Sequence, residues 1–147
     1  MKIREAGSAD IPAIVALLAD DERGRERERP GDPAYQRAFT AMKAQSGNVY
    51  LVIEMPDGAL AGCLQYTLIH GLSRQGAARA QIEGVRVHAA FRGQGLGGRL
   101  MQAALERACA DGAKLVQFTS DRSRSEAHRF YERLGFAATH LGFKKML

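Results

Sequence analysis

A run of glycines between a strand-like segment and a helix-like segment constrains this chain more than any other feature. The segment from Val85 to Gly98 has the sequence VRVHAAFRGQGLGG, and a helical pattern continues from it to about Asp111 and Gly112. Glycine has no Cβ atom and adopts positive φ angles, so a ligand can approach the backbone of such a turn closely. The first turn of a helix also leaves backbone N–H groups unpaired. This turn is therefore predicted to bind an anion such as a phosphate.

Two interpretations of the turn are open. Gly93, Gly95 and Gly98 match the dinucleotide-binding pattern G-x-G-x-x-G. That pattern requires a buried parallel strand directly before the glycines, whereas the segment from Gln81 to His88 is half polar and is separated from them. The second pattern is an arginine followed by two glycines, at positions 92, 95 and 97. In this pattern Arg92 adds a fixed positive charge that can pair with phosphate oxygens.

A second motif lies downstream, where residues 127–136 have the sequence AHRFYERLGF. With both motifs, the chain resembles the GNAT superfamily of acyl-CoA-dependent N-acetyltransferases. That family has a pyrophosphate loop of the form [QR]-x-x-G-x-[GA] and a later segment of the form A-x-x-x-Y-x-x-x-G-F. The resemblance is strong from Gln81 to Phe136 and weak over about the first sixty residues.

Bulk properties exclude several classes of protein. The chain has 147 residues, of which 46% are hydrophobic and 25% charged, as in an ordinary soluble domain. No apolar run is long enough to span a bilayer, and Cys63 and Cys109 fit neither a disulfide framework nor a metal site. The net charge of +5 suits a polyphosphate ligand, and no basic patch interleaved with aromatic residues suggests nucleic acid. We expect a cytoplasmic protein without a metal, a membrane partner or a nucleic-acid partner.

The hydrophobic pattern and the resemblance together imply one α/β domain over residues 1–147. We expect a mixed, mostly antiparallel sheet that is split at a bulged central strand, with helices on both faces. Strands are predicted at 2–6, 49–54, 59–69, around Glu83 and at 114–119, with one or two closing strands in 136–147. Helices are predicted from residue 11, at 34–45, after the glycine turn, and between a Ser123–Glu126 capping box and a Gly135 stop. Residues 20–33 are predicted to form an exposed loop, either without regular structure or with one helical turn.

An irregularity in the strand before the glycines predicts a β-bulge. Val85 and Val87 share one face, but Ile82 has the opposite parity. One extra residue at Glu83–Gly84 would restore a common apolar face. Such a strand can splay from its neighbour and leave backbone groups free. In the resembled family this splay holds the pantetheine arm, which pairs with the backbone at the positions of Val85 and Val87.

The resemblance implies acetyl transfer from acetyl-CoA, as cosubstrate, to a primary amine by direct attack in a ternary complex. Tyr131 is then the candidate acid for the leaving thiolate, although its helical spacing also fits a core residue. Glu83 is the candidate base, and a solvated strand glutamate is the alternative. The acidic residues between Asp20 and Glu28 are candidates for attracting a cationic amine. The histidines His88 and His128 are expected to be structural or exposed.

The candidate cofactor-binding residues are Val85, Val87, Arg92, Gly93, Gln94, Gly95, Leu96, Gly97, Gly98, Ser123 and Ser125. The two serines are included because Arg124 stands where many relatives have a cofactor-binding asparagine. The acceptor is a small molecule or a peptide or protein amine, and relatives commonly form homodimers. Two other functions stay open. They are a non-catalytic CoA-binding sensor or interaction module, and an NAD-type dinucleotide-binding domain.

Overall fold

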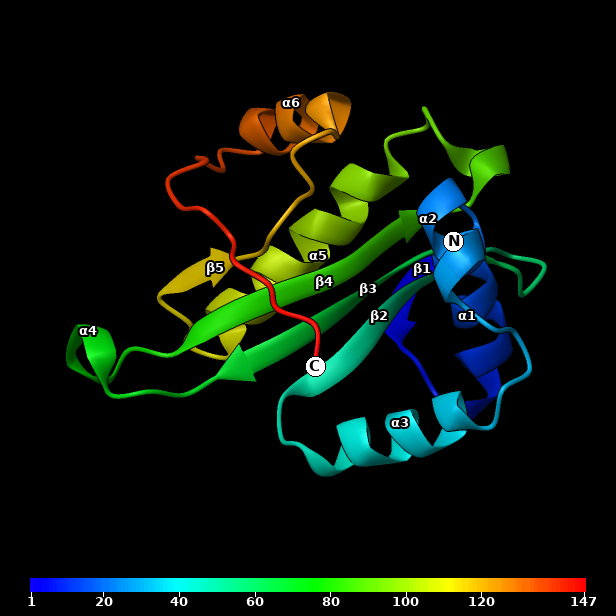
Figure 1. Ribbon diagram of the computed structural model, residues 1–147, viewed down its shortest axis with the longest axis horizontal. Coiled ribbons are helices and arrows are strands. Elements are labelled where there is room, and N and C mark those ends of the chain that lie inside the picture. Colours follow the sequence, from blue (N-terminus) through cyan, green and yellow to red (C-terminus); the bar gives the residue numbers. More distant parts are fainter. The chain divides into compact units, whose positions relative to one another are not determined.

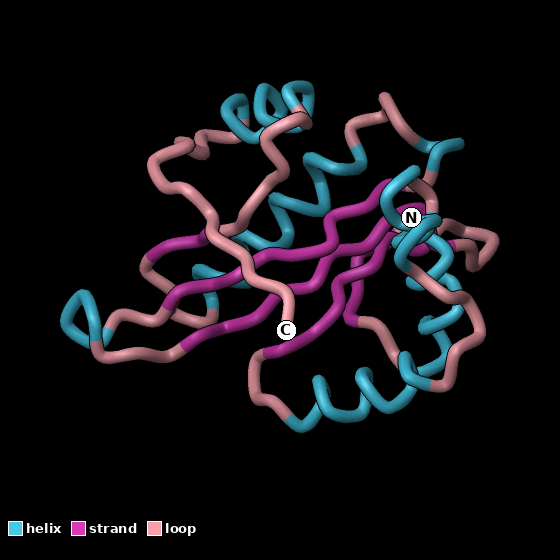
Figure 2. Tube along the Cα trace, in the orientation of Figure 1, coloured by secondary structure: helices cyan, strands magenta, loops and turns pink.

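The computed structural model describes residues 1–147, which form two compact units, residues 1–117 and residues 118–147. The first unit holds a five-stranded sheet, drawn as arrows in Figure 1 and in magenta in Figure 2. Its strands are β1 (Lys2–Glu5), β2 (Asn48–Glu54), β3 (Leu60–Ile69), β4 (Arg79–Val87) and β5 (Leu115–Gln117). Its helices are α1 (Ile11–Ala19), α2 (Glu22–Arg27), α3 (Ala34–Ala44), α4 (Ser73–Gly76) and α5 (Leu96–Ala110), with short 3-10 turns η1 (Ser8–Asp10) and η2 (Ala89–Phe91). The second unit contains α6 (Ser125–Arg133).

The sheet is mixed and mostly antiparallel, as predicted. The strands lie in chain order, β1 to β5, with antiparallel pairs up to β4 and a parallel pair between β4 and β5. The predicted hairpin joins β2 to β3 through Met55–Gly58, where the Met55 N–H donates to the Ala59 carbonyl at 2.9 Å. Gly58 closes this turn with a φ of 86°. A glycine fits there because other residues rarely adopt this angle.

The predicted bulge is present in β4. Gln65 of β3 pairs with Glu83 of β4, and Cys63 of β3 pairs with Arg86 of β4. Between these two pairs the chain advances by two residues on β3 but by three on β4. Leu64 therefore faces the two residues Gly84 and Val85, and Gly84 has a φ of 60°. Strand β5 pairs with β4 only at residues 79–81, so β4 has no strand partner on that edge beyond the bulge.

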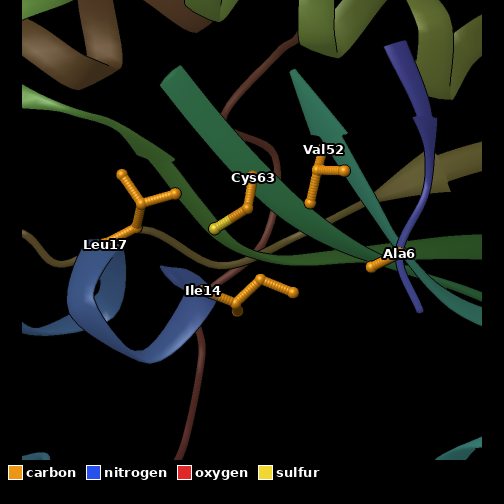
Figure 3. Packing of buried hydrophobic residues seen from close by; sticks show 5 residues of the cluster. All are labelled: Ala6, Ile14, Leu17, Val52 and Cys63. Carbon is orange, nitrogen blue, oxygen red and sulfur yellow. The ribbon is translucent and has the colours of Figure 1, made fainter. Parts of the chain in front are cut away.

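Helices cover both faces of the sheet, as predicted. Helices α1 and α3 pack on one face, where Ala6, Ile14, Leu17, Val52 and Cys63 form a buried cluster. Figure 3 shows Ile14 and Leu17 of α1 directed toward Cys63 and Val52. Full burial of an aliphatic side chain of this size stabilises a fold by about 1.5–3 kcal/mol.

Helix α5 packs on the opposite face against β2, β3 and β4. Tyr66 marks this face, since its hydroxyl donates to the Asp111 carboxylate at 2.9 Å and its ring lies under Arg107. Successive side chains alternate across a sheet. Ile53 of β2 and Leu64 of β3 are completely buried and lie on the same side of the sheet as Tyr66. Their side chains therefore point toward α5.

In the second unit, the predicted stop of the last helix is confirmed. Gly135 has a φ of 87°, and the Phe136 N–H donates back to the Tyr131 carbonyl at 3.1 Å. The predicted capping box is wrong. Arg124 occupies the N-cap without a side-chain hydrogen bond, because Ser123 instead donates to Asp121 from its N–H and from its hydroxyl.

Three further predictions of secondary structure are met only in part or not at all, and the helical turn allowed in residues 20–33 is one that is met in part. Residues 20–33 contain the helix α2, whose first turn is capped by Asp21 accepting from the Gly24 N–H at 2.7 Å. Strand β5 has three residues where six were predicted. Residues 136–147 form no strand, because their backbone pairs with no neighbouring strand and Phe143 and Met146 are exposed.

Candidate active site

The glycine turn opens helix α5 with backbone that only glycine adopts readily. Gly93 and Gly95 have φ angles of 77° and 75°, and Gly95 is the N-cap of α5 without any side-chain cap. A Cβ atom added to Gly93, Gly95 or Gly98 would meet no atom within 4 Å. The first turn of α5 therefore has no side-chain cap, and no neighbouring atom crowds these three glycines. Such a helix start can hold a phosphate.

The other residues of the turn support its shape. Leu96 is buried beneath the first turn of α5, and Gln94 donates from its side-chain amide to the Ala90 carbonyl at 3.3 Å. His88 caps η2, where its Nδ1 accepts from the Ala90 N–H at 3.2 Å. This contact gives His88 a structural role, as expected.

Arg92 joins the turn to two other parts of the first unit. Its Nε donates to the Val87 carbonyl at 3.1 Å, and its Nη2 pairs with the Asp20 carboxylate at 2.9 Å. Asp20 also accepts from the Ala89 N–H at 3.0 Å. The Arg92 charge is therefore matched by a carboxylate, and its guanidinium ties the turn to β4 and to the end of α1.

The bulge places Glu83 and Arg86 on one face of β4. Their partners on β3, Gln65 and Cys63, are two residues apart and so share the face covered by α1 and α3. Tyr50 of β2 pairs with Gln65 on the other side of β3. Tyr50, Gln65 and Glu83 thus form a row across three adjacent strands. The row ends at the bulge, beside the edge of β4 that β5 leaves open.

Val87 presents its backbone N–H to that open edge. The next residue, His88, donates its N–H to the Ala61 carbonyl of the β3 side at 2.9 Å. Because N–H groups alternate sides along a strand, the N–H of Val87 points away from β3. At the bulge, the Val85 carbonyl accepts from Nη1 of Arg86 at 3.0 Å. Of the two predicted residues, Val87 therefore directs its backbone N–H to the open edge, and Val85 lies within the bulge.

Charged and weakly acidic side chains surround the bulge. Burial raises the pKa of the Cys63 thiol to about 12, and burial also raises the pKa of Tyr50, assisted by the nearby Cys63 and Glu83. Both groups are therefore neutral at physiological pH. Arg86 pairs with Asp21 at 3.2 Å, but its Nε is buried without a hydrogen-bond acceptor. A buried donor without a partner costs about 1–3 kcal/mol.

The acidic segment before α3 is already engaged with groups of the chain itself. Asp20 pairs with Arg92, and Asp21 pairs with Arg86. Glu28 accepts from the Tyr35 hydroxyl at 2.9 Å and from Arg27 at 2.6 Å. Among the acids singled out as attractors of an amine, Glu22 and Glu26 are exposed.

The second unit holds the remaining predicted residues. The Tyr131 ring packs against Phe118, with ring centroids 4.3 Å apart, and against Phe130 at 5.1 Å. Ser123 is bonded to Asp121 as described above, and Ser125 is the first residue of α6. His128 forms a hydrogen bond through Nε2 with the Asp121 carbonyl at 2.8 Å, which fits the structural role expected for it.

Tyr50 is the residue at this site that the sequence did not identify. The β2 segment has the sequence NVYLVIE, which is typical of a buried strand and gives no sign of a functional tyrosine. Only the register of three strands brings it next to the bulge. A Cβ built on Gly84 would lie 3.7 Å from the Tyr50 hydroxyl oxygen. The structure holds no group of three histidine, cysteine, aspartate or glutamate side chains that could bind a metal ion, and no helix has the length and apolarity needed to cross a membrane.

Comparisons with known proteins cover nearly the whole chain. Residues 11–136 match the sequence model of the Acetyltransferase (GNAT) family. An L-methionine sulfoximine/L-methionine sulfone acetyltransferase of Pseudomonas aeruginosa is 31% identical over 138 residues, which are 91% of this chain and 78% of that protein. The aminoalkylphosphonate N-acetyltransferase of Salmonella typhimurium is 26% identical over 99% of this chain and 91% of its own. The crystal structure of a transcriptional regulator from Bacillus halodurans C-125 superposes with a TM-score of 0.94 at 45% identity, covering 99% of both chains.

Proposed function

This chain belongs to the GNAT family and is an acyl-CoA-dependent N-acetyltransferase, and we propose that it acetylates a small primary amine that carries an acid group, with acetyl-CoA as the donor. The observation that carries the proposal is the pairing of an uncapped, glycine-lined helix start with a bulged strand whose far edge is open. We also propose that the protein is a cytoplasmic, single-domain enzyme over residues 1–147 and that it forms a homodimer.

The first step of the proposal concerns the donor. The backbone N–H groups of Leu96, Gly97 and Gly98 would bind the pyrophosphate, with Gly93, Gln94 and Gly95 giving the turn its shape. Arg92 holds this turn against β4 through the Val87 carbonyl and Asp20. The backbone of Val85 and Val87 would bind the pantetheine arm along the open edge of β4. Ser123 and Ser125 are proposed as further contacts to that arm.

The second step concerns the chemistry. The amine nitrogen attacks the thioester carbonyl carbon, a C–N bond forms, and the C–S bond breaks to release the CoA thiolate. Glu83 would take the proton that the attacking ammonium must lose, directly or through water. The Val87 N–H would stabilise the oxyanion, and Tyr131 would protonate the thiolate. Direct attack by the amine needs no side-chain nucleophile, and burial raises the pKa of the Cys63 thiol to about 12, so that the thiol is not a competing thiolate.

Two independent observations support the proposed class of acceptor. The relatives named above are described as acting on methionine derivatives and on aminoalkylphosphonates, which are primary amines bearing a carboxylate or a phosphonate. In this chain, Glu83 and Arg86 share one face of β4, and Arg86 Nε has no acceptor. Glu83 would therefore take the ammonium and Arg86 the acid group. Because Nη1 donates to the Val85 carbonyl and Nη2 pairs with Asp21, Nε is the guanidinium N–H that Arg86 would offer to a carboxylate or phosphonate oxygen.

Calorimetric titration with acetyl-CoA, with NADH in parallel, tests the donor site first. We expect micromolar binding of acetyl-CoA alone, and an absence of acetyl-CoA binding would overturn the proposal. Turnover is then followed by thiol release with an amino acid and with the amine that lacks its carboxylate. Arg86→Gln should lower kcat/KM for the amino acid at least tenfold and leave the plain amine nearly unchanged. Equal losses for both acceptors would remove Arg86 from the acid-binding role.

A second candidate function is a CoA-binding module without catalysis. The observation that favours it is the 45% identity to a protein described as a transcriptional regulator. This candidate predicts tight acetyl-CoA binding without thiol release across a broad panel of amines. The same titration and thiol assay therefore separate the two candidates.

A further inference from the structure

A cavity of about 410 Å³ lies on the face of the sheet that α1 and α3 cover. Its walls include Ile14 and Leu18 from α1 and Phe39 and Met42 from α3, and its floor includes Tyr50. The catalytic steps proposed above do not use this space. A cavity of this volume is large enough for the side chain of a small molecule.

The lining of the cavity is uncharged. None of its lining residues is acidic, basic or a histidine, and most are aliphatic or aromatic. The amides at one end are bonded to one another, since Asn48 Oδ1 accepts from Gln65 Nε2 at 2.9 Å and Asn48 Nδ2 donates to Gln45 Oε1 at 2.5 Å. A charged group would lose its hydration there without gaining an opposite charge from the lining. The cavity therefore favours an uncharged, mainly apolar occupant.

The cavity is continuous with the row of residues that ends at the bulge. Leu18 and Tyr50 line it, and both lie against Gly84, with a built Cβ 3.4 Å from Leu18 Cδ2 and 3.7 Å from the Tyr50 hydroxyl. Gln65 also lines it and pairs directly with Glu83. Two strand spacings separate Glu83 from Tyr50, which is roughly 10 Å. A group bound at Glu83 could therefore extend into the cavity.

We propose that this cavity receives the side chain of the acceptor, which is an amino acid or aminophosphonate with an extended, uncharged, apolar side chain. The inference rests on the proposed function, because it assumes that Glu83 and Arg86 hold the amine and the acid group. It adds the specificity: Glu83 and Arg86 bind what all such acceptors share, and the cavity distinguishes them by the length and charge of the side chain.

The test measures kcat/KM for acetylation of glycine, L-alanine, L-norvaline, L-norleucine and L-glutamate by thiol release. Burial of each added methylene should raise kcat/KM roughly fourfold, while L-glutamate should fall well below L-norvaline. Ala41 lines the cavity and is exposed on α3, so Ala41→Trp fills the space without disturbing the core. In Ala41→Trp, kcat/KM should no longer rise with the length of the acceptor's side chain. Ala44→Trp is the matched control on the same helix outside the cavity, and it should keep the series unchanged.

Two further readouts separate the possible failures. Acetyl-CoA affinity, measured by calorimetry, should be equal in the wild type and in Ala41→Trp. If acetyl-CoA binds and glycine is acetylated as efficiently as L-norleucine, the cavity inference is overturned and the proposed function stands. If acetyl-CoA binds without turnover, calorimetry with L-norleucine tests the cavity directly. L-norleucine binding to the wild type that is lost in Ala41→Trp supports the cavity inference. If the wild type does not bind L-norleucine, the cavity inference is overturned. If acetyl-CoA does not bind, both proposals fall.

Discussion

Glu83 and Arg86 lie on the same face of β4, although residues three apart in a regular strand point to opposite faces. The extra residue opposite Leu64 resets the alternation, and Gly84 takes the positive φ that this requires. One glycine thus brings a carboxylate and a guanidinium to the face covered by α1. Pairing of β4 with β5 ends at Gln81, before the bulge, so the backbone of β4 is also open on its other edge from the bulge onward.

Substitution of Gly84 should therefore impair both stability and turnover. An alanine there must adopt a φ near 60° and place its Cβ 3.4 Å from Leu18 Cδ2. Left-handed backbone costs a non-glycine residue about 1–2 kcal/mol, so Gly84→Ala should lower the free energy of unfolding by that amount in urea titrations. Acetyl transfer should fall at least tenfold, since relief of the strain shifts Arg86 relative to Glu83.

Gly71→Ala is the control for Gly84→Ala. Gly71 has no positive φ, and a Cβ there would meet only Arg79 Nη1 at 3.5 Å. This variant should keep both the unfolding free energy and the rate. A Gly84→Ala protein with wild-type stability and turnover would show that the bulge is dispensable.

Gly98→Ala should separate folding from donor binding. Gly98 lies in the first turn of α5 with an ordinary helical φ, and a Cβ there would meet nothing within 4 Å. Alanine in a helix is favoured over glycine by about 0.5–1 kcal/mol, so Tm should stay the same or rise. The Kd for acetyl-CoA should increase at least tenfold by calorimetry if the pyrophosphate lies against this backbone. Gln102→Ala, exposed on the same helix, should leave the Kd unchanged, and an unchanged Kd in Gly98→Ala would move the pyrophosphate elsewhere.

The parts of the site that could be predicted from the sequence are those encoded locally. The bulge follows from the parity of Ile82 against Val85 and Val87, with a glycine beside the misfit. The phosphate-binding turn follows from the dense glycines before an amphipathic helix. Both depend on backbone conformations that neighbouring residues dictate.

The parts that could not be predicted depend on register between distant strands. Tyr50 faces the site only because β2, β3 and β4 align it with Gln65 and Glu83. The Arg86 contact with Asp21 likewise joins residues that are far apart in the sequence. The prediction of closing strands in residues 136–147 was wrong because it relied on a local apolar pattern alone. Such a pattern forms no strand unless the edge of another strand pairs with it.

A pH dependence of stability is expected from Asp10. Arg4 donates to both of its oxygens, at 2.7 and 2.9 Å, and this bonding, with a further bond from the Gly7 N–H, lowers the pKa of the carboxyl in the folded chain. A lowered folded pKa gives stability that is present above the unfolded pKa of about 4 and is lost as the pH falls through the folded pKa. Asp10→Asn should therefore reduce the free energy of unfolding at pH 7 by about 1–2 kcal/mol.

Urea titrations from neutral to acidic pH check this dependence. The difference between wild type and Asp10→Asn should persist to about pH 5 and shrink toward zero near about pH 2. Glu26→Gln, at an exposed position, should follow the wild type throughout. A difference between Asp10→Asn and wild type that stays constant with pH would mean that the Asp10 charge contributes nothing.

Tyr131→Phe tests the proposed acid while leaving its packing in place. The contacts of the ring with Phe118, Phe130 and Phe136, at 4.3, 5.1 and 6.4 Å between centroids, do not require the hydroxyl. Packing of the ring and acetyl-CoA affinity should therefore change little. Loss of a general acid should lower kcat by roughly ten- to a thousand-fold.

Tyr66→Phe is the matched control for Tyr131→Phe, because it also removes one tyrosine hydroxyl. That hydroxyl donates to Asp111 at 2.9 Å on the face of the sheet that α5 covers, away from Glu83. Its removal should lower the free energy of unfolding by about 1 kcal/mol and leave kcat unchanged. The two variants should thus differ in what they change: Tyr131→Phe should lower the rate, and Tyr66→Phe should lower the stability. If Tyr131→Phe keeps wild-type kcat, the hydroxyl does not protonate the thiolate, and Tyr131 has a structural role in the aromatic cluster around Phe118.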